Sequence, residues 1–140
     1  MLSKTAIHAV NALVELARLD EQEYAGAAKL AEKIHAPQNY LGKLLQTLAQ
    51  AGLVHGQKGL GGGFRLARRP EEITLYDVVE PIDHVSRWSG CLMSQGTCSE
   101  GDPCPMHREW AVVREKYFKM LHGSTIATIA SRREARSRAD

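Results

Sequence analysis

The 140-residue sequence contains no long hydrophobic run. Its apolar stretches are a few residues long, whereas a membrane-spanning helix needs roughly 18 to 20 consecutive apolar residues. The N-terminal stretch MLSKTAIHAV lacks the basic start and the cleavage site of a signal peptide. Hydrophobic residues still make up 44% of the chain, which is enough for a core. We therefore expect a soluble, cytoplasmic protein of one domain with an additional element.

Cysteine is scarce as well. The three cysteines, Cys91, Cys98 and Cys104, fall within 14 positions. An odd number of cysteines in a chain without an export signal argues against a disulfide scaffold. Their spacing lacks the Cys-x2-4-Cys knuckles of most structural zinc sites and the Cys-x2-Cys-x2-Cys run of ferredoxins. Reduced thiols that bind a metal are the better interpretation.

Acidic residues are missing from positions 33–70, although the whole chain has a formal net charge of only +2. The same interval carries the basic residues Lys33, Lys43, Lys58, Arg65, Arg68 and Arg69. One part of the folded surface should therefore be strongly positive, and a polyanion is its natural partner. A second basic run, between Arg132 and Arg138, has a small polar composition that predicts a frayed, solvated tail.

Apolar residues at spacings of three and four predict three helices in the first third of the chain. They cover about residues 3–19, 27–34 and 38–51. Ser3 is the expected N-cap of the first helix, and Gly52 is the expected C-cap of the third. A short turn that contains a proline separates the second helix from the third.

A glycine-rich segment, residues 56–63, follows the third helix and lies between two short β-type runs, residues 53–55 and 64–67. This pattern predicts a β-hairpin. No Lys-Ser or Lys-Thr pair and no helix opens directly behind the glycines, which argues against a nucleotide-binding loop. Helices followed by a basic hairpin indicate a mainly α fold with a small β-hairpin, a winged helix-turn-helix.

The second half of the sequence predicts a short helix, a long loop and a long helix. Thr74 or its neighbours cap the short helix, residues 75–79, which should end before Pro81. Residues 84–105 show no periodic pattern of apolar residues. A loop of this length in a compact domain is normally fixed by additional interactions. Pro105 opens the long helix, whose apolar stripe consists of Trp110, Val113, Tyr117 and Leu121, with Phe118 beside it. We expect another chain to cover this stripe, which makes the helix the dimer helix.

These elements give the expected domain organisation. The winged helix-turn-helix covers residues 1–82, the cysteine-rich loop 83–107, the dimerisation helix 105–123 and the basic tail 124–140. No pairing of a nucleophile with a base is evident, so we do not expect an enzyme.

The cysteine loop carries the pattern Cys91-x6-Cys98-x5-Cys104-x2-His107. Thiolates in one loop can converge on a metal or an iron-sulfur cluster, and His107, three positions after Cys104, can supply a nitrogen ligand. The spacing leaves three interpretations open, which are a cluster, a structural zinc site and unrelated loop cysteines.

Several short motifs occur in an order that resembles a known family. They are Leu2-Ser3-Lys4, Tyr40-Leu41, Gly52-Leu53-Val54, Lys58-Gly59-Leu60-Gly61-Gly62-Gly63-Phe64 and the cysteine pattern with its histidine. Over nearly its whole length the chain resembles the IscR and NsrR group of iron-sulfur winged-helix regulators, which belongs to the Rrf-two family of bacterial transcription factors.

The resemblance implies a homodimeric transcriptional regulator, with a repressor favoured, that binds a partly palindromic site in double-stranded promoter DNA. It implies an iron-sulfur cluster in each subunit, with 2Fe-2S favoured and 4Fe-4S as the alternative. The ligands would be Cys91, Cys98, Cys104 and a fourth group. His107 is the expected fourth ligand, because Ile7 stands where relatives with a wider cluster site carry a carboxylate from the other subunit. His8 is the alternative.

The expected DNA contacts come from the third helix and from the wing. They are Gln38, Asn39, Tyr40 and Lys43 in the helix, and Lys58, Gly61, Gly62, Gly63 and Arg65 in the wing. Lys58 stands where the family pattern has arginine, and lysine contacts phosphate as a point charge. Two other functions stay open. One is the same fold with a zinc or bare-thiol site that senses a metabolite or a partner protein, and the other is a small electron carrier.

Overall fold

The computed structural model of the chain describes residues 1–93, 101 and 104–140. In this part the chain is mostly helical, with one two-stranded sheet. The elements are α1 (Lys4–Ala17), α2 (Ala27–Ile34), α3 (Gln38–Gln50), β1 (Val54–Gln57), β2 (Gly63–Leu66), η1 (Pro70–Glu72), α4 (Leu75–Asp83), η2 (Val85–Ser89), α5 (His107–Gly123) and α6 (Ile126–Ala139). The labels η1 and η2 denote short 3-10 helices.

Helix α1 forms the centre of the core, with seven buried residues on its inner face. Ser3 caps it as predicted, because its Oγ accepts a hydrogen bond from the backbone N–H of Ala6 at 3.1 Å. The backbone N–H and the hydroxyl of Ser3 also donate to the Asp83 carboxylate, at 2.9 and 2.5 Å. The start of α1 is thus tied to the end of α4, 80 residues further along the chain.

A Ser3→Ala variant should therefore lose about 1–2 kcal/mol of unfolding free energy, because it removes both the cap and the hydroxyl contact with Asp83. Urea unfolding at one fixed protein concentration measures the loss. The matched control is Ser131→Ala on exposed α6, which should stay within about 0.5 kcal/mol of the parent protein. Equal unfolding midpoints for the two variants would show that the Ser3 contacts do not stabilise the fold.

Helices α2 and α3 form the helix-turn-helix. The turn between them uses His35, which adopts a left-handed φ of 56°, and Pro37, which precedes the first residue of α3. Leu41, Leu44, Leu45 and Leu48 of α3 are buried against the core. Gly52 follows α3 with a φ of 78°, close to the predicted end of the helix.

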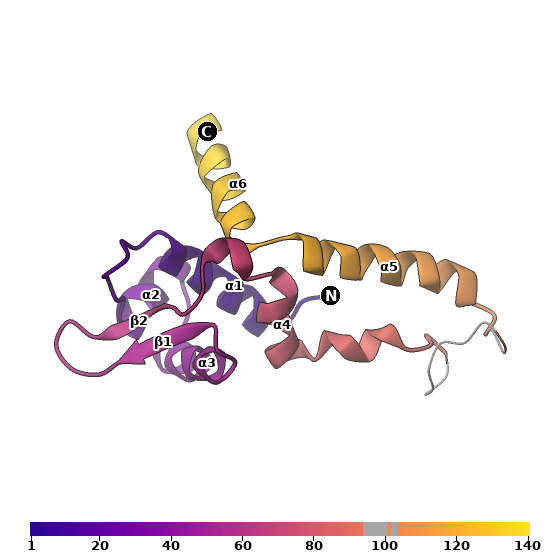
Figure 1. Cartoon of the computed structure of the whole chain (residues 1–140), viewed down its shortest axis with the longest axis horizontal. Coiled ribbons are helices and arrows are strands. Elements are labelled where there is room, and N and C mark those ends of the chain that lie inside the picture. Colours follow the sequence, from indigo (N-terminus) through magenta and orange to yellow (C-terminus); the bar gives the residue numbers. More distant parts are fainter. Residues whose placement is uncertain (94–100, 102–103) are drawn as a thin grey trace.

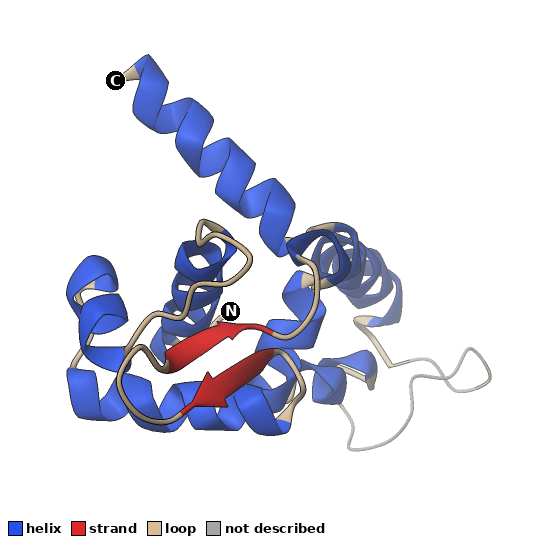
Figure 2. Cartoon of the chain, turned by 60° about the vertical axis from the view of Figure 1, so that its left-hand side comes forward, coloured by secondary structure: helices blue, strands red, loops and turns tan. Residues whose placement is uncertain are grey.

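The wing is the antiparallel pair β1 and β2, with Val54 opposite Leu66 and Gln57 opposite Gly63. Figure 2 shows the two strands lying across the helices, with their connecting loop at one side. Phe64 also exchanges two backbone hydrogen bonds with Ala25, of 2.8 and 2.9 Å, which fastens the hairpin to the segment before α2. The predicted hairpin and the winged helix-turn-helix are confirmed.

Helix α4 is longer than predicted, because it continues through Pro81 to Asp83. The expectation that it ends before the proline is wrong. Proline removes one N–H from the helix, and contacts around the last turn offset the loss. Asp83 accepts from Ser3, and the Glu80 carboxylate accepts from the backbone and the hydroxyl of Ser86. The N-terminal capping box between Thr74 and Asp77 agrees with the predicted cap.

The segment after α4 also differs from the predicted loop, since Val85–Ser89 forms η2 with Val85 buried. Figure 1 shows α5 leaving the body of the molecule as an arm, with η2 alongside. Residues 94–100, which include Cys98, lie outside the described part of the chain. In that described part, no helix is both long enough and apolar enough to cross a membrane.

The C-terminal segment is helix α6, so the basic run is helical and not frayed, although most of its side chains are exposed, as predicted. Ile126 and Ala130 of α6 are buried, and the Arg133 guanidinium donates to the Asn11 side chain at 2.6 Å. The junction between α5 and α6 is also fixed, because Ile126 N–H donates to the Ile73 carbonyl at 2.9 Å. Ile126 and Ala130, four positions apart in the first half of the helix, anchor this arginine-rich segment on α1.

Candidate nucleic-acid interface and thiol loop

The outer face of α3 is polar and exposed. Asn39, Lys43, Gln46 and Gln50 recur at spacings of three and four and lie on this face, and Gln38 is exposed at the helix start. Gln46 and Gln50 are missing from the contacts predicted from the sequence. Counting helical positions onward from Asn39 would have found them.

Tyr40 points toward α1 and not outward. Its hydroxyl donates to the Thr5 hydroxyl, and its ring meets the His8 ring edge-on, with 5.9 Å between the ring centres. Tyr40 therefore fixes the start of α3 on α1. The Nδ1 atom of His8 is buried and has no hydrogen-bond partner among the described residues. Its assignment as a cluster ligand stays a prediction.

The wing presents two kinds of basic residue. Lys58 is exposed at the end of β1. Arg65 is half-buried, with its guanidinium 4.9 Å from the centre of the Tyr24 ring and 3.3 Å from the Glu21 carbonyl oxygen. Arg65 thus braces the wing against the loop before α2, whereas Lys58 is directed to solvent. Gly61, Gly62 and Gly63 lie beyond Lys58, where the wing loop turns back into β2.

Two of the three predicted thiol ligands lie together. A hydrogen bond with Cys91 raises the pKa of the Cys104 thiol, and desolvation adds to the shift. The backbone N–H of His107 donates to the Cys104 carbonyl at 3.0 Å, so His107 follows within one turn at the start of α5. Among the described residues, which do not include Cys98, no group of three or more His, Cys, Asp or Glu side chains is placed to hold a metal. Two adjacent soft sulfur donors suit a soft metal or a cluster, but the His107 side chain does not form a three-residue ligand group with them in the described part of the chain.

Helix α5 holds the backbone that leads to Cys91. Trp110 Nε1–H donates to the Gly90 carbonyl at 2.8 Å, and the Arg114 guanidinium donates to the Ser89 carbonyl at 3.2 Å. Trp110 and Arg114 are four residues apart, so they act from one face of the helix. We use the name thiol loop for the segment that carries the predicted ligands Cys91, Cys98 and Cys104. A movement of this loop would therefore be transmitted directly to α5.

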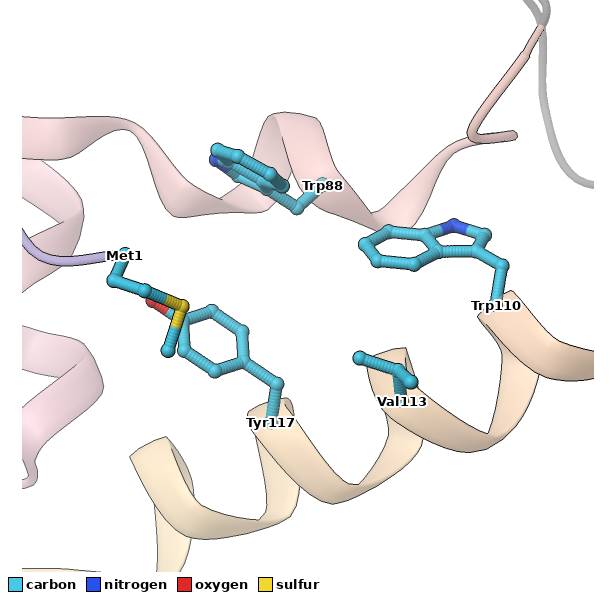
Figure 3. Close-up of a pocket in the computed structure, with 5 residues that line it drawn as sticks. All are labelled: Met1, Trp88, Trp110, Val113 and Tyr117. Atoms are coloured by element: carbon cyan, nitrogen blue, oxygen red, sulfur yellow. The ribbon is translucent and has the colours of Figure 1, made fainter.

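The predicted apolar stripe of α5 faces its own chain for most of its length. Leu121 is fully buried, and Trp110 and Tyr117 line a cavity of about 100 Å³ together with Val113, Met1 and Trp88. Figure 3 shows Trp88 on η2 facing the α5 side chains across this cavity. The apolar residues that α5 leaves exposed are Val112, Val113 and Met120. η2 covers one side of the stripe that we expected to face another chain, and the role of α5 as the dimer helix stays a prediction.

Comparison with known proteins identifies the family. A family model described as an iron-dependent transcriptional regulator, Rrf2, matches residues 2–132. The chain belongs to the Rrf2 (Rrf-two) family. The match covers the winged helix-turn-helix, the thiol loop, α5 and the first half of α6, so the family resemblance inferred from the motifs is confirmed.

Individual relatives agree with this assignment. A protein of Aquifex aeolicus named as an HTH-type transcriptional regulator is 30% identical over 128 residues, which are 90% of this chain and 88% of the relative. IscR of Aliivibrio salmonicida is 27% identical over 128 residues, covering 91% of this chain and 76% of IscR. The solved structure of CymR, the global cysteine regulator of Bacillus subtilis, superposes with a TM-score of 0.79 at 24% identity, covering 94% of this chain and 96% of CymR. The chain is therefore an Rrf2-family transcriptional regulator.

Proposed function

We propose that this regulator is a homodimeric repressor that senses redox state, nitric oxide or iron-sulfur status through a cluster bound by Cys91, Cys98, Cys104 and His107. The contact between Cys91 and Cys104 at the start of α5, with His107 one turn away, is the observation that carries the proposal. The similarity to IscR and to a family of iron-dependent regulators supports it. When bound, the cluster supplies a centre that oxygen and nitric oxide modify.

The proposed DNA contacts follow from the exposure and the charge of side chains on α3 and the wing. Asn39, Lys43 and Gln46 on the outer face of α3 meet base edges in the major groove, and Lys58 in the wing meets phosphate. Tyr40 and Arg65 act as positioning residues, because their polar ends already contact Thr5 and the Glu21 carbonyl. The glycines of the wing loop let the backbone approach the duplex.

Mutants should distinguish the phosphate contact of the wing from the base contacts of α3. Lys58→Ala should weaken binding to every duplex and lower the slope of log K against log salt by about 1, because one phosphate contact is lost. Asn39→Ala and Lys43→Ala should change sequence preference, with a loss of about 1–3 kcal/mol for each base read. Fluorescence anisotropy with a specific and a random duplex measures both effects. Equal losses on both duplexes for all three variants would refute this division of roles.

Helix α5 couples the thiol loop to the DNA-binding face of α3. Trp110 and Arg114 hold the Ser89 and Gly90 carbonyls immediately before Cys91. The other end of α5 is fixed to the DNA-binding part at the start of α4, because the carbonyl of Ser124, the residue after α5, accepts from Leu75 N–H at 2.7 Å. In a dimer formed through the exposed Val112, Val113 and Met120, a shift of α5 changes the spacing of the two α3 helices.

Analysis of iron and sulfide, together with the visible absorption of protein purified without oxygen, tests the proposal. Equal amounts of iron and sulfide with visible absorption bands are expected. A colourless, zinc-loaded protein with full operator affinity would overturn the cluster and favour a regulator that senses a metabolite or a partner protein.

A further inference from the structure

The apex of the wing carries an apolar side chain that the fold does not use. Leu60 has a relative exposure of 107%, the largest among the exposed large hydrophobic residues of the described chain. The glycines on both sides of it leave no neighbouring side chain to cover it. Figure 1 shows the wing loop extending beyond the body of the molecule. Leu60 is therefore the outermost side chain of the wing tip.

The backbone at the apex explains why Leu60 projects outward. Gly62 N–H donates to the Gly59 carbonyl at 3.0 Å, and Gly61 has a φ of 76°. A positive φ at the third of four residues is the mark of a type II turn, in which glycine fills the third position and proline favours the second. Leu60 occupies the second position, where leucine offers the turn no advantage. Its side chain is not explained by local structure.

We propose that Leu60 inserts into the minor groove of the duplex as an apolar wedge and makes binding sensitive to how easily the contacted base step deforms. This inference rests on the proposed DNA binding. The minor groove is about 6 Å wide, and a tip that carries a single side chain between glycines is slender enough to enter it. Apolar wedges partly unstack base steps, and pyrimidine-purine steps such as TA deform most readily. Lys58, two residues before Leu60, is exposed and lies within reach of the phosphates that border the groove.

The test compares Leu60→Ser with Leu60→Met. In vitro selection with the parent protein first supplies a specific duplex, and three versions of it then carry TA, AA or GC at the step that the wing reaches. Leu60→Ser should bind the TA duplex roughly ten-fold more weakly, because the apolar contact is lost. Its affinity should no longer depend on the flanking step, while its salt slope should stay unchanged because no charge is removed. Leu60→Met should retain the affinity of the parent, since methionine is also an apolar wedge.

Failure of this inference can be told apart from failure of DNA binding. If Leu60→Ser binds all three duplexes as the parent does, while Lys58→Ala still loses affinity, the wedge is wrong and DNA binding stands. If the selection enriches no sequence and the parent protein binds no duplex, the proposed function itself fails. A lowered salt slope in Leu60→Ser would also overturn the wedge, because it would indicate a displaced wing.

Discussion

A Cys104→Ser protein purified without oxygen is expected to be colourless and to contain neither iron nor sulfide. Cys104 contacts Cys91 and precedes α5, so its loss removes one soft donor from the centre of the proposed ligand set. Serine offers a harder oxygen that stays protonated at neutral pH and does not replace a thiolate. Visible absorption and iron analysis measure the loss, which should be complete.

Trp110→Phe is the matched control for the thiol variant. It keeps an aromatic ring in the cavity beside Trp88, although a smaller one, and removes the hydrogen bond to the Gly90 carbonyl. All thiols remain, so the protein should still become coloured but lose its iron about ten-fold faster to a chelator. Full visible absorption in Cys104→Ser would mean that Cys104 is not a ligand.

Gly63→Ala is expected to have the largest effect on the wing. Gly63 has a φ of 132°, which alanine rarely adopts, and an added Cβ would lie 2.5 Å from the Ala25 carbonyl oxygen. The two backbone hydrogen bonds between Ala25 and Phe64 would have to break or shift. We expect a loss of about 2–4 kcal/mol in unfolding free energy and a wing that no longer fits the duplex. Urea unfolding and anisotropy on the selected duplex measure the two effects.

Gly42→Ala provides the comparison in the unfolding experiment. Gly42 lies within α3, and an added Cβ there would meet no atom within 4 Å beyond the local backbone of its own helix. Alanine should therefore stabilise the helix by up to about 1 kcal/mol. If Gly63→Ala unfolded at the same urea concentration as the parent protein, the tight packing of the wing against Ala25 would be contradicted.

Local signals in the sequence were enough to predict the DNA-binding half of the fold. Ser3, the glycines after α3 and the buried leucines each act through short-range rules for capping, turns and helical period. The end of α4 was missed, because Pro81 is tolerated through contacts with Ser3, which is far away in the sequence. The same holds for α6, whose packing depends on Asn11 and the core around Ile126.

The candidate site was predictable in part. Spacing and family pattern indicated Cys91, Cys104 and His107. The hydrogen bonds from Trp110 and Arg114 to the backbone before Cys91 could not be predicted, because they depend on how η2 lies beside α5. Tyr40 and Arg65 were expected at the DNA, whereas their contacts with Thr5 and Tyr24 depend on tertiary packing. The sequence alone does not single out Leu60, because it is one residue within a glycine-rich segment. Its exposure in the structure draws attention to it.

The most direct test of the account is the operator affinity of one anaerobic preparation, followed while nitric oxide bleaches its visible absorption. If α5 couples the thiol loop to the spacing of the DNA-binding helices, affinity should change by about ten-fold or more in step with the loss of absorption. Cys104→Ser should show a single affinity that nitric oxide does not alter. An operator affinity that stayed constant while the absorption disappeared would contradict the account.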